Sequence, residues 1–557
     1  SGSLIVRGGS VIIEQDAEKS DYKTEIIVAS TEVYGGQIII GKLSNAKVTG
    51  SGFRTGSIII EQDAEKSTDV DTSLIVKTGG SLLFDASLNT GYDYCLKLGA
   101  NTYTTFENGS TIDLDVTETG NPKPILIGQN ASLLDLNENS ELAAKFEHLF
   151  TLNKAELFSV PFANQNSEIF TVDAKIKTWS EANYEMDDLT NAQTFNYMQG
   201  FSIIYPAADY LSITEGILNT GTLSLGLEYT DGISIDQNGW NLCGNPYPSA
   251  IDWELQTELG NISSTIYQYD DISKQYKLYQ KGGLALNGGS QYVKPGQGFF
   301  VRASGSGASL SLNNDMRLHY AVDGSSTKET PSDFLRLKVE GNSYSDETII
   351  RFVNGATNGY DEGTDAYKLL SPVTDAPQLF SLMGSEKSKT AINSLPTHEP
   401  IGATVQLCFK AGVDGTYKIT ASELNFESSV DVILKDLNDN TTYNLKTTSE
   451  YSFNYTTSDA EERFELKFGD GAVGVNNLDN NKLKLDIYAF GDNVYIKTFD
   501  DKNYKYELYN INGKLIKSNN LTKKGLNAIN VANLPGIYIV KVISGNKIYQ
   551  KSVSLVK

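Results

Sequence analysis

The stretch IIEQDAEKS, residues 12–20, returns unchanged at residues 59–67. A shorter stretch, SLIV, occurs at residues 3–6 and again at residues 73–76. The offsets, 47 and 70, are close to two and three times a unit of about 23 residues. A short β-rich unit at a fixed period is typical of a stacked parallel solenoid, in which each coil buries its apolar side chains on the next. We therefore expect a parallel β-solenoid at residues 1–155, with a sandwich around a duplicated hairpin as the alternative.

Composition favours β structure in the rest of the chain. Tyr and Phe are common, with 31 and 22 residues, whereas Met is scarce, with 4. Short apolar and aromatic runs between turn-forming residues indicate strands. Because 557 residues exceed what one core supports, several domains are expected. We predict an all-β chain with two β-sandwiches, at residues 156–325 and 326–470, and a polar linker at residues 323–332.

The C-terminal part is expected to fold separately, after a Gly-, Asn- and Asp-rich linker at residues 471–481. Turn signals divide residues 482–557 into short alternating segments, and Asn512-Gly513 is a strong tight-hairpin signal because both residues tolerate positive φ. Strands are expected at residues 483–488, 493–498, 504–509, 514–518, 526–530, 536–543 and 547–556. Seven short strands predict a small Ig-like sandwich.

Charge is distributed unevenly along the chain. The formal net charge is −23, which excludes nucleic acid as a partner because phosphate binding needs a basic face. Residues 476–557 contain thirteen Lys against five Asp and one Glu, a net of +7, so the preceding residues carry −30. A basic end on an acidic body suggests that the end meets a different surface from the rest.

Few residues support catalysis. The three histidines are His148, His319 and His398, and His148 falls in a short helix expected at residues 140–150. Nucleophile elbows, zinc-protease motifs and phosphate loops are absent from the sequence. Adjacent carboxylates on a strand point to opposite faces, so they are poor candidates for glycosidase-type pairs. We predict no catalytic residues and no enzyme activity. The carboxylate pairs weighed here are Asp187-Asp188, Asp270-Asp271, Asp361-Glu362 and Glu461-Glu462.

Neither a metal site nor a cofactor is expected. The cysteines, Cys95, Cys243 and Cys408, are far apart, which predicts buried apolar residues rather than a disulfide framework or a zinc site. Asp-rich turns such as residues 436–440 leave a structural calcium ion as an alternative.

The C-terminal segment resembles a known family. YELYNINGKLI, residues 506–516, and NLPGIYIVKV, residues 533–542, are similar to the two blocks of the type A sorting domain of type IX secretion cargo in Bacteroidota. The blocks have the family's order and spacing, although Pro535 directly precedes Gly536, where many members insert a residue. The matching positions are Tyr509, Asn510, Asn512, Gly513, Leu534, Pro535, Gly536, Ile537, Tyr538 and Lys541, followed by the basic terminal residue Lys557.

This resemblance implies a route and partners. Such a cargo crosses the inner membrane, folds in the periplasm and passes an outer-membrane translocon, while a shuttle β-barrel holds its tail. The tail is then often cleaved. The chain is therefore expected to be secreted or displayed on the cell surface. Because it does not begin with Met, we expect the numbering to start inside a longer precursor.

A second resemblance covers the middle of the chain. GWNLCGNPYPSAIDW, residues 239–253, and VKPGQGFFV, residues 293–301, are similar to blocks of large secreted Bacteroidota proteins. Cys243 stands where that block more often has Val or Ile, which agrees with a buried role. The family assigns no activity to these blocks, and we expect Trp240 and Trp253 to be packing residues.

Together these features predict an exported surface protein with an adhesin-like or display body. The alternative is a carbohydrate-active enzyme or glycan-binding protein with the same tail. Carboxylates that converge with Lys or Arg in one groove would favour the alternative, whereas a smooth groove with ladders of Ile, Val and Asn would favour a structural body.

Overall fold

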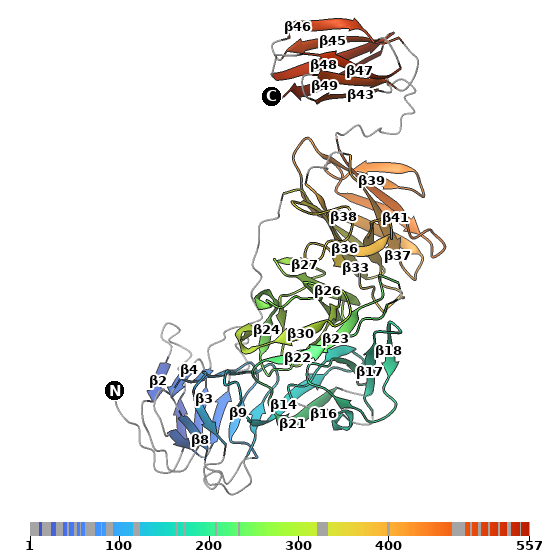
Figure 1. Ribbon diagram of the computed structural model, residues 1–557. Helices are drawn as coiled ribbons and strands as arrows, with labels where there is room; N and C mark the ends of the chain where they lie inside the picture. Colours follow the sequence, from blue (N-terminus) through green and yellow to red (C-terminus); the bar gives the residue numbers. More distant parts are fainter. Residues whose placement is uncertain are drawn as a thin grey trace. The chain divides into compact units, whose positions relative to one another are not determined.

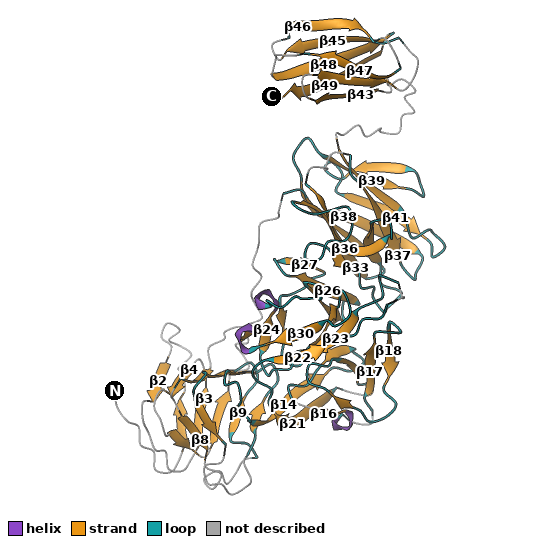
Figure 2. Cartoon of the chain, in the orientation of Figure 1, coloured by secondary structure: helices purple, strands orange, loops and turns teal. Residues whose placement is uncertain are grey.

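The computed structural model confirms that the chain is nearly all β (Figure 2). Among the described residues the helices are three 3-10 turns, η2 (Ser167–Ile169), η3 (Trp253–Leu255) and η4 (Asn314–Met316). The chain divides into two compact units, the body (Ser1–Val473) and the tail (Gly474–Lys557). The structure describes residues 10–13, 24–28, 37–41, 44–48, 53–55, 57–61, 73–78, 81–84, 93–114, 123–162, 165–170, 173–206, 209–231, 234–319, 332–397, 402–469, 485–490, 493–498, 503–510, 513–521, 524–531, 536–545 and 547–555.

Three parallel sheets form the first part of the body (Figure 1). From β3 to β13, the chain adds one strand to each of the three sheets in turn. The first sheet contains β1 (Ser10–Ile13), β3 (Gln37–Gly41), β6 (Ser57–Glu61), β9 (Leu96–Leu98), β12 (Ile125–Ile127) and β14 (Ala143–Phe150). The second contains β2 (Thr24–Val28), β4 (Ser44–Val48), β7 (Ser73–Val76), β10 (Tyr103–Phe106) and β13 (Ser132–Asp135). The third contains β5 (Phe53–Thr55), β8 (Ser81–Phe84) and β11 (Thr111–Asp113).

Strand pairing explains the repeat but not its expected period. Ile12 pairs with Ile39, and Ile39 pairs with Ile59, so the two copies of IIEQDAEKS begin two strands apart in one sheet. These steps are 27 and 20 residues, and the step from Tyr103 to Ser132 is 29. The uniform unit of about 23 residues is therefore wrong. The turns vary in length, whereas the strands must keep a register that points the same side chains inward.

The segment expected to be a short helix is instead strand β14. It pairs in parallel with β12 and antiparallel with β21 (Tyr210–Ile217), which joins the parallel region to the middle of the body. Ala144, Phe146 and Phe150 are buried on its inner face, an alternation that fits a strand. The helix prediction is wrong because the flanking strands β12 and β21 complete the backbone hydrogen bonds of this segment.

The middle of the body consists of small antiparallel sheets. Two of them are β15 (Glu156–Phe158), β20 (Phe201–Ile204), β17 (Lys175–Ser180) and β18 (Glu185–Asp188), and β16 (Gln165–Asn166) with β19 (Thr194–Phe195). A pair joins β22 (Leu223–Gly226) to β30 (Ser309–Leu312). A five-stranded sheet has the order β23 (Trp240–Gly244), β29 (Gly298–Arg302), β25 (Thr265–Asp270), β26 (Gln275–Gln280) and β27 (Leu284–Leu286). The last is β28 (Tyr292–Val293), β24 (Ala250–Asp252) and β31 (Arg317–Leu318).

The block at residues 239–253 is a core element, as predicted. Trp240, Cys243, Tyr247 and Trp253 are fully buried. The amide nitrogen of Asn245 donates to the carbonyls of three other residues, which holds the turn between β23 and β24 in place.

The last part of the body is one hydrogen-bonded sheet of eleven strands. The sheet curls on itself, because the ring of Tyr451 in β41 lies 4.3 Å from that of Tyr443 in β40, at the opposite end of the strand order. Its strands are β32 (Phe334–Gly341), β33 (Tyr344–Val353), β34 (Ala366–Tyr367), β35 (Gln378–Met383), β36 (Ser388–Pro396), β37 (Thr404–Lys410), β38 (Gly415–Asn425), β39 (Asp431–Asp436), β40 (Thr441–Asn444), β41 (Glu450–Tyr455) and β42 (Phe464–Gly469).

This sheet shares a core with the middle of the body. Trp240 and Phe300 belong to the same buried cluster as Phe334 and Ile392. Buried hydrogen bonds cross the same boundary, including Tyr267 Oη to the carbonyl of Tyr367 at 2.8 Å. Shared apolar burial and satisfied polar groups make these two parts one packed structure.

The tail contains seven strands, and each lies within two residues of its predicted bounds. One sheet contains β43 (Leu485–Phe490), β44 (Asn493–Thr498) and β47 (Gly525–Asn530). The other has the order β46 (Leu515–Asn520), β45 (Lys505–Asn510), β48 (Gly536–Ser544) and β49 (Lys547–Leu555). Side chains of both sheets form one core. The linkers expected at residues 323–332 and 471–481 lie outside the described residues, apart from Ser332.

Candidate functional site

The two motif blocks of the tail lie side by side on neighbouring strands. β45 pairs antiparallel with β48, so that Tyr509 is opposite Ile539 and Asn510 is opposite Tyr538. These strands occupy the middle of the four-stranded sheet. The sequence places the blocks about 25 residues apart, and the sheet joins them into one surface.

Asn510 and Gly513 form the turn between β45 and β46. Asn510 Oδ1 accepts a hydrogen bond from the backbone N–H of Lys514 at 2.9 Å, and the Gly513 N–H donates to the Asn510 carbonyl at 3.0 Å. Gly513 has a φ of +76°, a conformation that costs little only without a Cβ. This motif pair therefore fixes the hairpin. Asn512 lies outside the described residues.

One face of this sheet carries a charged cluster centred on Glu507. Tyr509 Oη donates to Glu507 Oε2 at 2.8 Å, Lys505 Nζ lies 2.8 Å from Oε1, and Lys541 Nζ lies 3.7 Å from Oε2. The hydrogen bond from Lys505, followed by that from Tyr509, lowers the pKa of Glu507. The cluster joins Tyr509 to Lys541. We did not predict Glu507 as a site residue, although it stands two positions before Tyr509 and so shares its face of the strand.

The opposite face of β48 builds the tail core. Tyr538 is 5% exposed and packs in the core with Val540 and Val542, whereas Ile537 on the outer face is 55% exposed. Gly536 pairs with Leu555 at the start of the strand. The block thus combines core residues with surface residues. Leu534, Pro535 and Lys557 lie outside the described residues.

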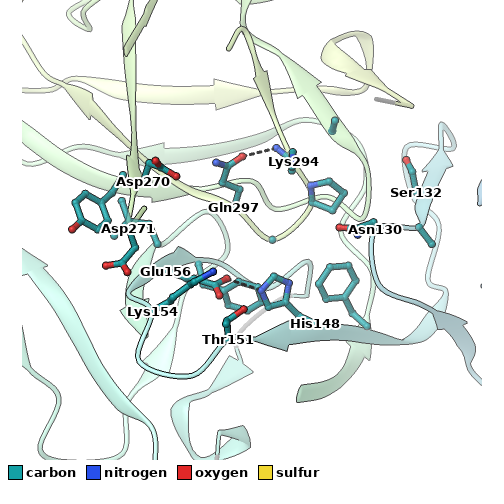
Figure 3. Close-up of a pocket in the computed structure, with 18 of the residues that line it drawn as sticks. Asn130, Ser132, His148, Thr151, Lys154, Glu156, Asp270, Asp271, Lys294 and Gln297 are labelled. Atoms are coloured by element: carbon teal, nitrogen blue, oxygen red, sulfur yellow. Dashed lines mark hydrogen bonds and ion pairs between the residues drawn. The ribbon is translucent and has the colours of Figure 1, made fainter. Parts of the chain in front are cut away.

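The body contains a cleft of about 410 Å³ where the parallel sheets meet the middle sheets (Figure 3). Its volume is within the range of small-molecule sites, roughly 300–1,000 Å³. It is lined by the turns before β10 and β13, strand β14 with the following turn, the β25–β26 hairpin and the segment before β29. The labelled side chains that lie around it are Asn130, Ser132, His148, Thr151, Lys154, Glu156, Asp270, Asp271, Lys294 and Gln297.

His148 lies on one wall of this cleft. Its Nε2 is 2.9 Å from Glu156 Oε2, and its ring centroid lies 4.5 Å from that of Phe150 and 4.6 Å from that of Phe158. The imidazole is therefore held by packing and by one carboxylate. This arrangement positions Glu156 in the cleft.

Of the four carboxylate pairs, Asp270-Asp271 differs most from expectation. Asp270 ends β25 and Asp271 lies in the hairpin turn, so both line the cleft. The expectation that adjacent carboxylates point to opposite faces holds only within a strand, and Asp271 lies beyond the end of β25. Asp270 accepts from Ser273 Oγ at 2.6 Å, and Asp271 lies 2.7 Å from Lys274 Nζ.

Four carboxylates of the other three pairs contact nearby protein groups. Asp361 accepts a hydrogen bond from Thr357. Asp188, on the exposed strand β18, lies 2.9 Å from Lys177 Nζ. Glu461 and Glu462 lie 3.4 and 2.7 Å from the ammonium groups of Lys389 and Lys387, respectively.

His319 is held neutral beside the cleft wall. Its Nε2 lies 2.8 Å from Thr105 Oγ1, and its Nδ1 lies 2.9 Å from Ser132 Oγ. Burial, with the nearby Arg317 charge, lowers the pKa of His319 to about 4. His398 lies outside the described residues.

Metal ligands are not clustered in the described part of the chain, where no group of three or more His, Cys, Asp or Glu could hold an ion. Asp436, in the turn considered for calcium, accepts from Arg463 Nη2 at 2.9 Å and from Tyr451 Oη at 2.8 Å. Its carboxylate is thus engaged by protein groups. A structural calcium ion elsewhere stays an open alternative.

The cysteines are buried, as predicted, and none forms a disulfide. Burial raises the pKa of the Cys95 and Cys243 thiols to about 12. Within the residues that the structure describes, no helix is long and apolar enough to cross a membrane.

Comparisons with known families agree with the geometry of the tail. Residues 490–556 match the model described as the secretion system C-terminal sorting domain. The chain is therefore a type IX secretion cargo, exported to the cell surface or secreted. Residues 69–468 match the model described as domain of unknown function DUF8693, and the chain belongs to that family. A search of the curated proteins finds no match.

Proposed function

We propose that this cargo is a surface adhesin-like or display protein without enzyme activity. In this proposal the three parallel sheets act as a β-solenoid, the middle and last parts of the body are β-sandwiches fused into one piece, and the tail is an Ig-like sorting sandwich. The cycling of successive strands through three parallel sheets supports the solenoid.

One observation carries the proposal most directly: the body is a single compact unit. Shared cores and buried hydrogen bonds join successive parts, as in the bond from Gln280 Nε2 to the carbonyl of Asp365 at 2.9 Å. A compact body whose parts share cores holds a binding surface in place, which reduces the ordering cost of binding.

The sorting function of the tail is proposed to use the surface around Glu507, Tyr509 and Lys541. A basic domain with a defined strand edge suits docking by charge complementarity and β-augmentation. Strand β46 is one of the two edge strands of its sheet, and most of its residues are exposed. The partners in this proposal are the outer-membrane translocon and a shuttle β-barrel.

A glycan-binding body is the second candidate, because the cleft brings carboxylates and lysines together. A carbohydrate-active enzyme has less support, since Glu156, Asp270 and Asp271 each already have a cationic or hydrogen-bonding partner. A general acid or nucleophile needs a carboxyl group directed at the scissile bond.

An adhesion assay tests the proposal. Host cells with a type IX translocon would display either the full chain or a fluorescent protein carrying residues 476–557. We expect cells with the full chain to adhere several-fold better to polysaccharide- or mucin-coated surfaces. Equal adhesion would contradict the proposal, and release of reducing sugar ends from the same surfaces would replace it with the enzyme.

A further inference from the structure

We propose that the cleft beside His148 is a binding site for a sugar residue of a surface glycan. This inference deepens the proposed function and rests on it, because it names the ligand class that the displayed body would bind. The site comprises the cleft-lining residues in Figure 3, contributed by segments from residue 101 to residue 297.

The walls of the cleft offer both hydrogen-bond donors and acceptors. Thr151 contributes a hydroxyl, Asn130 an amide, and Lys154 an ammonium group, while Glu156 and Asp270 contribute carboxylates. A sugar hydroxyl both donates and accepts hydrogen bonds, so it matches a mixed lining better than a ligand of one charge does. The polar groups therefore favour a polyol.

The carboxylates in the cleft already have protein partners. Glu156 lies 2.9 Å from His148, Asp271 lies 2.7 Å from Lys274, and Asp270 lies 3.3 Å from Lys277. A cationic ligand would therefore be desolvated without gaining a new ion pair. Lys154 makes no ion pair among the residues that the structure describes, so an acidic sugar could pair with it. The cleft thus favours a neutral or acidic sugar over a cationic ligand.

Two asparagines occupy equivalent turns of successive coils at this edge. Asn101 and Asn130 stand before β10 and β13, with φ angles of 59° and 58°. Neither side-chain amide makes a hydrogen bond within the part of the chain that the structure describes. A purely structural explanation for these residues is that Asn tolerates this backbone conformation. Their free amides also line the cleft, where they can bind sugar hydroxyls.

The floor of the cleft is rigid. Phe146 and Phe158 are buried beneath it, and Gln297 Oε1 accepts from the Lys294 N–H at 3.0 Å. The backbone of Gly296 approaches Phe158 so closely that an added Cβ would lie 2.9 Å from its ring. A preformed site binds with less loss of side-chain entropy.

The test titrates the purified full chain with methyl glycosides of glucose, galactose, mannose and N-acetylglucosamine, and with methyl glucuronoside. We expect at least one of these glycosides to bind with a Kd below about 10 mM. Asn130→Gly removes the amide but tolerates the positive φ, and should weaken binding roughly three- to tenfold. Thr151→Val, which removes a hydroxyl at nearly constant volume, should act in the same direction.

Asn153→Gly is the matched control, because Asn153 also has a positive φ, 55°, but does not line the cleft. It should bind like the unaltered chain, and thermal unfolding should confirm that all variants fold. Failure of every glycoside to bind, or unchanged affinity in both cleft variants, would overturn this inference. If adhesion by the displayed chain persisted in that case, the proposed function would stand without it. If cells that display the unaltered chain did not adhere, the proposed function itself would be refuted.

Discussion

Arg317 Nη2 donates a hydrogen bond to the backbone carbonyl of Leu133 at 3.0 Å, although the two residues are 184 positions apart. Leu133 belongs to β13, the last strand of the second parallel sheet. Its N–H donates to the Pro248 carbonyl at 2.8 Å, and Arg317 Nη1 also donates to the carbonyl of Asp135. An exposed sheet edge can pair with another chain and so promote aggregation. These hydrogen bonds cover the exposed edge of β13.

Replacing this arginine should destabilise the body. Arg317→Met leaves the buried carbonyl of Leu133 without its side-chain donor and the carbonyl of Asp135 with Thr220 Oγ1 as its remaining side-chain donor. We expect a loss of about 3 kcal/mol or more in the free energy of unfolding, measured by chemical denaturation. Lys387→Met, which breaks an exposed ion pair with Glu462, is the control and should cost less than about 1 kcal/mol. Equal losses would show that Arg317 does not seal the edge.

Acid should weaken the body through His319. Its pKa is about 4 in the folded chain, below the ordinary value of 6.5, so between these values the unfolded chain binds the proton more readily. Its contribution is therefore fully present above pH 6.5 and is lost as the pH falls toward 4, by roughly 3 kcal/mol. Denaturation at several pH values should show this loss. The loss should be smaller in His319→Asn, and an unchanged pH dependence in that variant would contradict the assignment.

Substitutions at the neighbouring residues Tyr538 and Ile537 should differ in their effect on the stability of the tail. Tyr538→Ser removes a buried ring from the tail core and should cost roughly 3–5 kcal/mol in the unfolding of the tail. Ile537→Ser changes a side chain that is 55% exposed, so it should alter stability by less than about 0.5 kcal/mol. Chemical denaturation of the full chain measures both. If Ile537→Ser keeps the tail folded and still reduces export, the outer face of β48 contacts the secretion machinery.

Export should depend on the tail and on the translocon. A signal peptide and a fluorescent protein fused before residues 476–557 should bring fluorescence to the surface or the medium of a type IX host. The same fusion should remain in the periplasm of a strain that lacks the translocon. Periplasmic retention in both strains would mean that these residues are not sufficient for sorting. The reason to expect sufficiency is that the tail forms its own compact unit with its own core.

Local sequence signals determined the tail. Its strands alternate inward and outward side chains, and turns such as the one at Gly513 separate them. Both signals act within a few residues, so the chain alone specifies the strands and the β45–β46 hairpin, whereas the pairing of Tyr509 with Ile539 forms only in the packed sheet. The repeat at residues 12 and 59 also correctly indicated parallel strands of one sheet, because both copies begin in strands of that sheet.

Only the tertiary structure decided the features that depend on distant partners. Residues 140–150 became a strand because β12 and β21 complete its backbone hydrogen bonds. The hairpin around Asp270 and Asp271 meets His148 and Glu156 in the cleft only after the body has packed. Likewise, nothing near Arg317 in the sequence indicates that it covers Leu133. The physical reason is that alternation and turn residues act within a few positions, whereas pairing, edge covering and cleft formation depend on segments from 19 to 184 residues apart.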